Sequence, residues 1–230
     1  MFRLILISLA ALLLLAPAAS ADRRLSDERT ETRWAHVNDA TPVRKAPDHG
    51  APAIARLRHS TEDGLPEVYL ALRSRTVDGR AWIEVRVPGR PNGRTGWVRR
   101  TALGPFHVVR TSLVVDRSRL RATLFEDGKR IWSSPVGVGA PGTPTPGGRF
   151  YVRQKLRNLR GSPIYGPWAF GTSAYSVLSD WPGGGVVGIH GTDQPQLLPG
   201  RVSHGCVRVP NRAIARLARL MPVGTPVRIR

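Results

Sequence analysis

The 230-residue chain lacks several features that are common at this length. It contains one cysteine, only three lysines beside 32 arginines, and aromatic residues make up 7% of it. A single cysteine excludes an internal disulfide framework, and the paired cysteine spacing of zinc sites is absent. Acidic residues are also scarce, with 16 against 35 basic ones, which gives a formal net charge of +19.

The N-terminus is the most apolar part of the chain. A basic residue at position 3 precedes an apolar run over residues 4–16, and small residues follow at 19–21. This order predicts a cleaved export signal over residues 1–21. The run is shorter than the roughly 20 residues that cross a bilayer comfortably, so a retained anchor is the weaker alternative. We expect the mature chain to be exported to the cell wall or periplasm.

Export makes the lone cysteine informative. Exported proteins usually pair their cysteines, so a single one indicates a free reactive thiol or an intermolecular bridge, with a buried structural thiol as the alternative. Cys206 stands in VSHGCVRVP, and His190 stands sixteen positions earlier in GVVGIHGTDQP. A cysteine nucleophile needs a base that takes its proton. The pair predicts nucleophilic catalysis, and a core histidine or a Cys/His metal site is a weaker interpretation.

The positive charge is concentrated in the half of the chain that contains Cys206. Residues 22–104 carry 16 basic and 11 acidic groups, whereas residues 105–230 carry 18 and 5. A basic field attracts anionic partners. Export argues against nucleic acid, and no helix-turn-helix or stacking-aromatic pattern accompanies the charge. We therefore expect an anionic cell envelope as a partner, with a general arginine bias in composition as the alternative.

Turn-forming residues divide the mature chain into segments. Residues 22–32 are polar and patternless, which predicts a flexible lead-in. Residues 33–104 contain short, partly alternating apolar runs between Pro/Gly-rich turns, which predicts a small β-barrel. Gly104-Pro105 marks the joint, and residues 105–230 form the predicted second domain.

The second domain has three clear local signals. Asp127-Gly128 between apolar runs predicts a hairpin. The segment NRAIARLARLM, residues 211–221, predicts an amphipathic helix with Asn211 as its N-cap and Pro222 after its end. The terminal TPVRIR reads as a strand. We expect a mostly β domain with one late helix.

Both halves contain motifs that resemble known families. Residues 33–104, with V-R-x-x-P, W-I-E-V and G-W-V, resemble bacterial SH3-like domains, which commonly bind the wall or act as spacers. We interpret Trp82 and Trp97 in this segment as barrel core. Residues 107–230 resemble the L,D-transpeptidase catalytic domain of the YkuD family, through I-H-G-T, S-H-G-C-V-R and V-G-V-G…P-T-P-G-G-R-F.

The resemblance implies roles for individual residues. Cys206 is the implied nucleophile, His190 the base, and the carbonyl of Gly191 the group that orients the base, without an acidic third member. Further implied roles are oxyanion or loop support by Ser203, His204 and Gly205, and substrate binding by Arg208 and Thr192. The hydroxyls of Ser203 and Thr192 can instead order the loop. A thiol beside a base and backbone donors is expected to have a lowered pKa.

The implied reaction exchanges one peptide bond for another in peptidoglycan. The thiolate attacks a stem peptide, the terminal D-alanine leaves, and an amine of a second stem peptide takes the acyl group. This chemistry needs no metal and no cofactor. Two alternatives remain open: a cysteine L,D-carboxypeptidase or amidase that releases the acyl group to water, and a non-enzymatic wall-binding protein.

Overall fold

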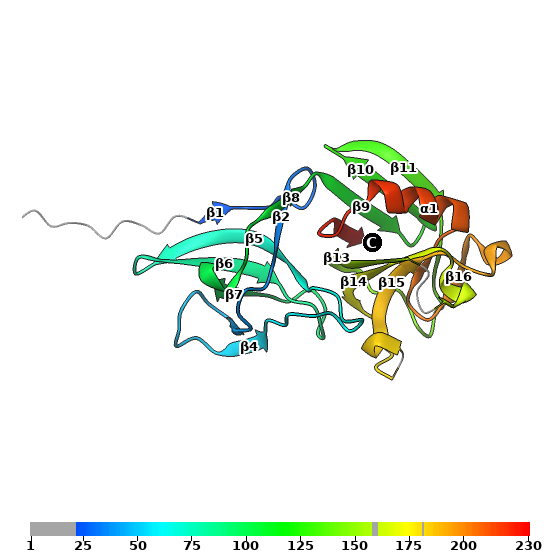
Figure 1. The fold of residues 1–230 in the computed structure, drawn as a ribbon. Coiled ribbons are helices and arrows are strands. Elements are labelled where there is room, and N and C mark those ends of the chain that lie inside the picture. Colours follow the sequence, from blue (N-terminus) through cyan, green and yellow to red (C-terminus); the bar gives the residue numbers. More distant parts are fainter. Residues whose placement is uncertain (1–21, 158–160, 181) are drawn as a thin grey trace, which may run out of the picture.

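The computed structural model describes residues 22–157, 161–180 and 182–230 (Figure 1). The predicted export signal lies outside these residues. The described chain forms an eight-stranded sheet followed by a ten-stranded sheet, and it has a single α-helix. This confirms the mostly β class. No helix in the described ranges has the length and apolar character needed to cross a membrane.

The first unit is built on the eight-stranded sheet, whose strands run in the order β4-β3-β7-β6-β5-β2-β8, with β1 paired to β5. Its strands are β1 (Arg23–Arg24), β2 (Thr32–His36), β3 (Pro42–Arg44), β4 (Ala53–Arg56), β5 (Val68–Val77), β6 (Arg80–Arg86), β7 (Thr95–Arg99) and β8 (His107–Val109), and a short 3-10 helix, η1, covers Arg100–Ala102. Trp82 and Trp97 are both buried, as expected for core residues.

The second unit is built on the ten-stranded sheet, in the order β11-β10-β9-β18-β13-β14-β15-β17-β12-β16. Its strands are β9 (Thr111–Asp116), β10 (Arg121–Glu126), β11 (Lys129–Pro135), β12 (Gly137–Gly139), β13 (Gly148–Arg157), β14 (Trp168–Tyr175), β15 (Val186–His190), β16 (Gly200–Ser203), β17 (Val207–Arg208) and β18 (Pro226–Ile229). Short 3-10 helices are η3 (Pro163–Tyr165), η4 (Pro182–Gly185) and η5 (Pro195–Leu197).

The predicted hairpin and the predicted final strand are confirmed. Asp127 and Gly128 both have positive φ, 48° and 76°, and join β10 to β11 as the two central residues of a tight turn. The last strand, β18, lies between β9 and β13 in the middle of the sheet. It runs parallel to β9, so the C-terminus completes the core rather than adding an edge.

The late helix is confirmed, but its predicted cap is wrong. Helix α1 spans Asn211–Leu220 and buries Ile214, Leu217 and Ala218. Pro210 occupies the N-cap position, and no side chain caps the helix. The side-chain oxygen of Asn211 instead accepts a hydrogen bond, 2.8 Å long, from the N–H of Thr192. The Asn211 side chain thus bonds to Thr192, in another part of the chain, and not to the backbone at the start of its own helix.

The structure differs from the expectation for residues 22–32 and for the joint. The supposed lead-in packs on the first sheet: β1 pairs with β5, Leu25 is buried, and the Ser26 hydroxyl bonds the carbonyl of Ala71. The carboxylate of Glu28 likewise accepts a hydrogen bond, 2.8 Å long, from Arg86 of β6. Beyond Gly104-Pro105, β8 still pairs with β2 of the first sheet. The second sheet therefore begins only with β9.

The two units pack together beside β13 and β14 (Figure 1). Tyr151 of β13 is fully buried, and its hydroxyl donates to the carbonyl of Val68 over 2.9 Å. Asn92 bonds the backbone of Tyr175 in both directions, at 2.7 and 2.9 Å. These contacts bring loops of the first unit next to β14, which pairs with β15, the strand that ends at His190.

Candidate active site

Two neighbouring strands position the cysteine and the histidine. His190 is the last residue of β15, and Cys206 comes directly before β17. These strands are parallel partners with Ile189 opposite Val207, and both of those side chains are fully buried in the core. Because side chains alternate along a strand, Gly188 and His190 face the opposite side from Ile189. The thiol and the imidazole therefore emerge on one face.

Both groups line the same pocket. It is also lined by Gly188, by Tyr165 from η3, and by Glu62 and Asp63 from the first unit. A methyl group on Gly188 would lie 3.4 Å from Cδ2 of His190 and 3.7 Å from Sγ of Cys206. The absence of a side chain at position 188 thus leaves the space between the thiol and the imidazole open. Backbone freedom is not the reason, since Gly188 has no positive φ.

Hydrogen bonds fix the orientation of both groups. The N–H of Gly188 donates to Sγ of Cys206 over 3.3 Å. Nδ1 of His190 lies 2.6 Å from the carbonyl oxygen of Gly191. A carbonyl only accepts, so Nδ1 carries the proton, and in the neutral ring Nε2 is the free base. The rings of Tyr165 and His190 pack edge to face, with centroids 5.1 Å apart.

Burial keeps this pair neutral near pH 7. The pKa of His190 falls to about 4 because the imidazole is desolvated and close to the charge of Arg208, although its bond to Gly191 acts in the opposite direction. Burial raises the pKa of Cys206, although the Gly188 N–H and Arg208 lower it in part. The expectation of a lowered thiol pKa is therefore wrong. Desolvation outweighs the neighbouring donors.

The residues just before Cys206 bond to one another. The Ser203 hydroxyl donates to the carbonyl of Cys206 over 2.6 Å and accepts the N–H of Gly205 over 3.2 Å. Gly205 has φ +116°, and a Cβ there would lie 2.8 Å from Cβ of Ser176. The N–H of Gly205 is thus used within the loop. His204 is exposed and, like Ser203 and Gly205, is not among the described residues that line the pocket.

Arg208 and Thr192 also lie outside the pocket lining. Thr192 is fully buried, and its hydroxyl accepts the N–H of Gln194 over 3.0 Å, so it orders the loop after His190. Arg208 donates to Oε1 of Gln194 over 3.2 Å, and its Nε has no hydrogen-bond partner among the residues that the structure describes. Its charge nevertheless acts on both His190 and Cys206.

Asn211 is a functional candidate that sequence reasoning placed elsewhere. Its side chain holds the N–H of Thr192 and lies where a Cβ on Gly166 or Gly191 would be, 2.3 Å from either. The close approach of these two glycines sets the position of the Gly191 carbonyl that orients His190. The sequence gives no signal for Glu62 and Asp63 in the pocket, because no local pattern connects them to a cysteine more than 140 positions away.

Comparison with known proteins identifies the second unit. A family model of the L,D-transpeptidase catalytic domain, YkuD, matches residues 110–229. L,D-transpeptidase YkuD of Bacillus subtilis is 30% identical over 125 residues, which cover 54% of this chain and 66% of that protein. The Bacillus licheniformis protein of the same name is 32% identical over 106 residues, covering 46% and 57%. The chain thus spans less than two thirds of these relatives.

Solved structures include a similar domain. The catalytic domain of the E. faecium L,D-transpeptidase is 28% identical, with a TM-score of 0.42, and the match covers 52% of this chain and 96% of that one. The described ranges hold no group of three or more His, Cys, Asp or Glu residues arranged for a metal ion. Because the family model spans more than half of the chain and includes both His190 and Cys206, the chain belongs to the YkuD family of L,D-transpeptidase catalytic domains.

Proposed function

We propose that this chain is a peptidoglycan L,D-transpeptidase that works through an acyl-enzyme on Cys206. The observation that carries the proposal is the geometry of the pair: Cys206 and His190 share one pocket, and the Nδ1 contact with Gly191 leaves Nε2 as the base. No acidic residue is needed for that orientation, because a backbone carbonyl provides it.

The neutral pair determines how the proton moves. Sγ attacks the carbonyl carbon that precedes a terminal D-alanine while Nε2 of His190 takes the thiol proton. The same proton passes to the leaving amine of D-alanine as the tetrahedral intermediate collapses to a thioester. An amine of a second stem peptide then attacks the thioester and gives a proton to Nε2, and the thiol is restored as the new peptide bond forms.

The oxyanion of the intermediate needs donors near Cys206. Since the N–H of Gly205 is bonded to Ser203, we assign this role to the N–H of Cys206 itself, with His204 in support. Arg208 is the proposed partner of a substrate carboxylate, which its fork of N–H groups can bind in a bidentate manner. Because Arg208 is not among the described residues that line the pocket, a substrate carboxylate would bind it outside the pocket.

The rest of the chain fits an envelope protein. We propose that residues 1–21 direct export, that the mature protein acts in the cell wall or periplasm, and that the first unit is SH3-like and helps to bind the wall. The excess of 18 basic over 5 acidic groups in residues 105–230 supports an anionic envelope as partner.

Intact-mass analysis of the full mature chain with purified tetrapeptide stems tests the function. We expect an adduct of one stem minus D-alanine on the protein, absent in Cys206→Ser, followed by cross-linked dimers. Adduct formation with trimmed monomers alone would favour the carboxypeptidase alternative. A folded protein that binds sacculi but never gains the adduct would instead be a non-enzymatic wall-binding protein.

A further inference from the structure

A second concave region lies on the sheet of the second unit and shares no lining residue with the pocket of Cys206. It is a groove of about 700 Å³ whose floor is formed by β9, β10, β18 and the beginning of β13. The segment 24–30 of the first unit forms one side of it. Arginines outnumber acidic residues by seven to three in the lining, and we call this region the basic groove.

The acidic side chains of the basic groove already have partners. Glu28 accepts two hydrogen bonds from Arg86, at 2.5 and 2.8 Å, and lies 3.4 Å from Arg149. Asp27 accepts three backbone N–H groups of its own loop. Asp116 accepts two N–H groups of the turn that follows it, and it pairs with the side chain of the last residue, at 3.2 Å.

Several arginines of the basic groove are not balanced in this way. Among the residues that the structure describes, four exposed lining arginines have no carboxylate partner: Arg29, Arg119, Arg121 and Arg228. Their positive charges therefore act on whatever enters the groove. Such a concave, basic surface raises the local concentration of anions.

Two of the lining arginines face one another across adjacent strands. Arg149 of β13 lies directly opposite Arg228 of β18 in an antiparallel pair. Both side chains are exposed on the face opposite the core, because their neighbours Phe150 and Val227 are buried in it. Like charges in this arrangement destabilise a sheet. An anion bound between the two guanidinium groups would remove the repulsion.

Apolar side chains lie among these charges. Val114 of β9 is the neighbour of Arg228, and Phe125 of β10 lies on the same face as Arg121. Both apolar side chains are half-buried and line the groove. A small inorganic anion would use only the charges of this floor. A chain with spaced anionic groups and apolar surface between them would use both.

The basic groove and the catalytic pocket lie on either side of the first unit. Along β13, Arg149 lines the groove, Tyr151 packs against the first unit, and Gln154 lines the pocket. The core residues of this strand, Phe150 and Val152, point to the other face of the sheet. A polymer bound in the groove would therefore be held on the face of the sheet that carries the thiol.

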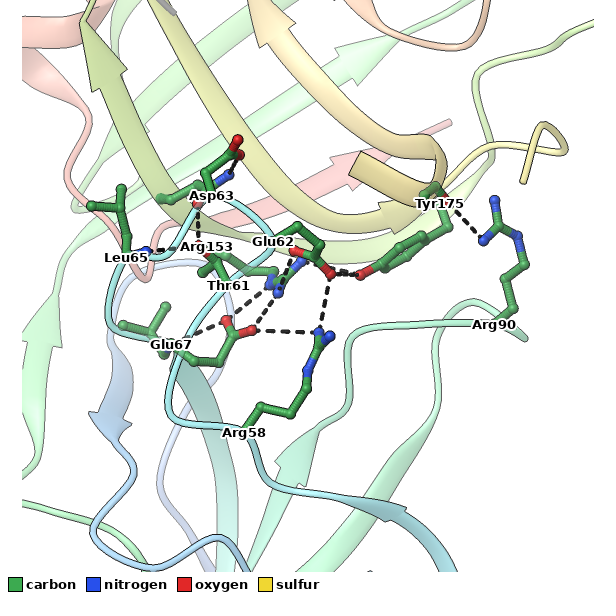
Figure 2. A network of polar contacts seen from close by, with 12 residues as sticks. Arg58, Thr61, Glu62, Asp63, Leu65, Glu67, Arg90, Arg153 and Tyr175 are labelled. Carbon is green, nitrogen blue, oxygen red and sulfur yellow. Dashed lines mark hydrogen bonds and ion pairs between the residues drawn. The ribbon is translucent and has the colours of Figure 1, made fainter. Parts of the chain in front are cut away.

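A buried ion-pair network fixes the two units to each other (Figure 2). Arg153 of β13 is 2% exposed, and its Nε donates to Glu67 over 2.9 Å while Nη2 lies 3.0 Å from Oε2 of Glu62. The hydroxyl of Tyr175 donates to the other oxygen of Glu62 over 2.6 Å, and Arg58 lies 3.1 Å from that oxygen. Because both units line the basic groove, this network forms the groove before a ligand binds, which lowers the cost of binding.

We propose that the basic groove is a second peptidoglycan-binding site, which binds carboxylates of stem peptides along a glycan strand. This inference rests on the proposed function, which places the chain on peptidoglycan, and adds to it a surface that holds the enzyme there. The planar guanidinium group matches a carboxylate in geometry. Stem peptides end in carboxylates and repeat along the strand, which suits several arginines on one floor.

The test measures the retention of the full mature chain on purified sacculi at increasing salt. The first variant combines Arg149→Gln with Arg228→Gln, and the second combines Arg119→Gln with Arg121→Gln. The matched control combines Arg212→Gln with Arg216→Gln, because these exposed residues of α1 line neither the groove nor the pocket. Urea unfolding and iodoacetamide labelling of Cys206 verify that each variant is folded.

The sacculi are used in three forms to identify the anion. One form is untreated, one has lost its attached phosphodiester polymers through hydrofluoric acid, and one has its carboxylates converted to amides. We expect each groove variant to bind untreated sacculi about tenfold more weakly, at about threefold for each lost exposed contact. The control should bind like the unsubstituted chain. Removal of phosphodiesters should leave the difference unchanged, and amidation should abolish it.

Three results would overturn the basic groove as a peptidoglycan site. Equal retention of the groove variants and the unsubstituted chain would show that the groove binds nothing on the wall. An equal loss in the control would mean that net charge alone matters. A difference that disappears with the phosphodiesters, and not with the carboxylates, would assign the groove to another polymer. Groove-dependent retention by a chain that forms no adduct with tetrapeptide stems would support the groove and overturn the proposed catalytic function.

Discussion

Replacing His190 by glutamine should make the folded chain less sensitive to acid. Burial lowers the pKa of this imidazole to about 4, against about 6.5 in an unfolded chain. Between these two values the unfolded state binds a proton that the folded state does not, so the free energy of unfolding falls as the pH falls. The difference between these two pKa values corresponds to roughly 3 kcal/mol, at 1.36 kcal/mol for each tenfold change in proton affinity. That stability is fully present above pH 6.5 and is lost by about pH 4.

The assay is urea unfolding of the unsubstituted chain and of His190→Gln at pH 7, 6, 5 and 4. Carboxyls with lowered pKa, such as Glu62 and Asp116 at about 2, begin to lose their contribution only near pH 4 and do so in both proteins, so the difference between the two curves isolates the imidazole. His59→Gln is the control: His59 is exposed, and this variant should follow the unsubstituted chain. Parallel losses in His190→Gln and the unsubstituted chain from pH 7 to 4 would refute a buried neutral imidazole, and the proton-transfer route proposed from it.

Iodoacetamide labelling of Cys206, measured by intact mass, should rise about tenfold per pH unit between pH 7 and 9, because burial raises the thiol pKa and only the thiolate reacts. Glu67→Gln should lower the free energy of unfolding in urea by about 3 kcal/mol, because the buried Arg153 loses its bidentate partner; the double variant Arg153→Met, Glu67→Leu should regain most of that loss. Gly188→Ala should fold normally and acylate at least tenfold more slowly in a stem-adduct assay, because its methyl group enters the space between His190 and Cys206.

Each of these predictions has a clear contrary result. Labelling that is already maximal at pH 7 would mean a preformed thiolate. A double variant as unstable as Glu67→Gln would mean that packing, rather than an unpaired charge, causes the loss. Full activity of Gly188→Ala would show that substrate does not approach the thiol over position 188.

Local sequence was sufficient for the elements whose hydrogen bonds are short-range. The Asp127-Gly128 turn and the helix from Asn211 were predictable because each is determined by backbone preference and apolar spacing within about ten residues. The Cys206 and His190 pair was predictable for another reason: the chemistry of a thiol nucleophile requires a base, and the two residues lie in glycine-flanked motifs with a specific spacing. The SH3-like and export assignments stay predictions.

Only the tertiary structure decided the protonation states of Cys206 and His190 and the residues that line their pocket. The thiol and the imidazole are neutral because desolvation outweighs local donors, and desolvation depends on strands that are far apart in the sequence. Asn211 does not cap its helix as predicted, because its side chain accepts the N–H of Thr192, which comes within reach only after folding. Glu67 and Glu62 of the first unit, 86 and 91 positions away in the sequence, are held beside the second unit because each pairs with the buried Arg153. Sequence patterns record what a segment prefers on its own, whereas burial and long-range charge depend on what the rest of the chain brings to it.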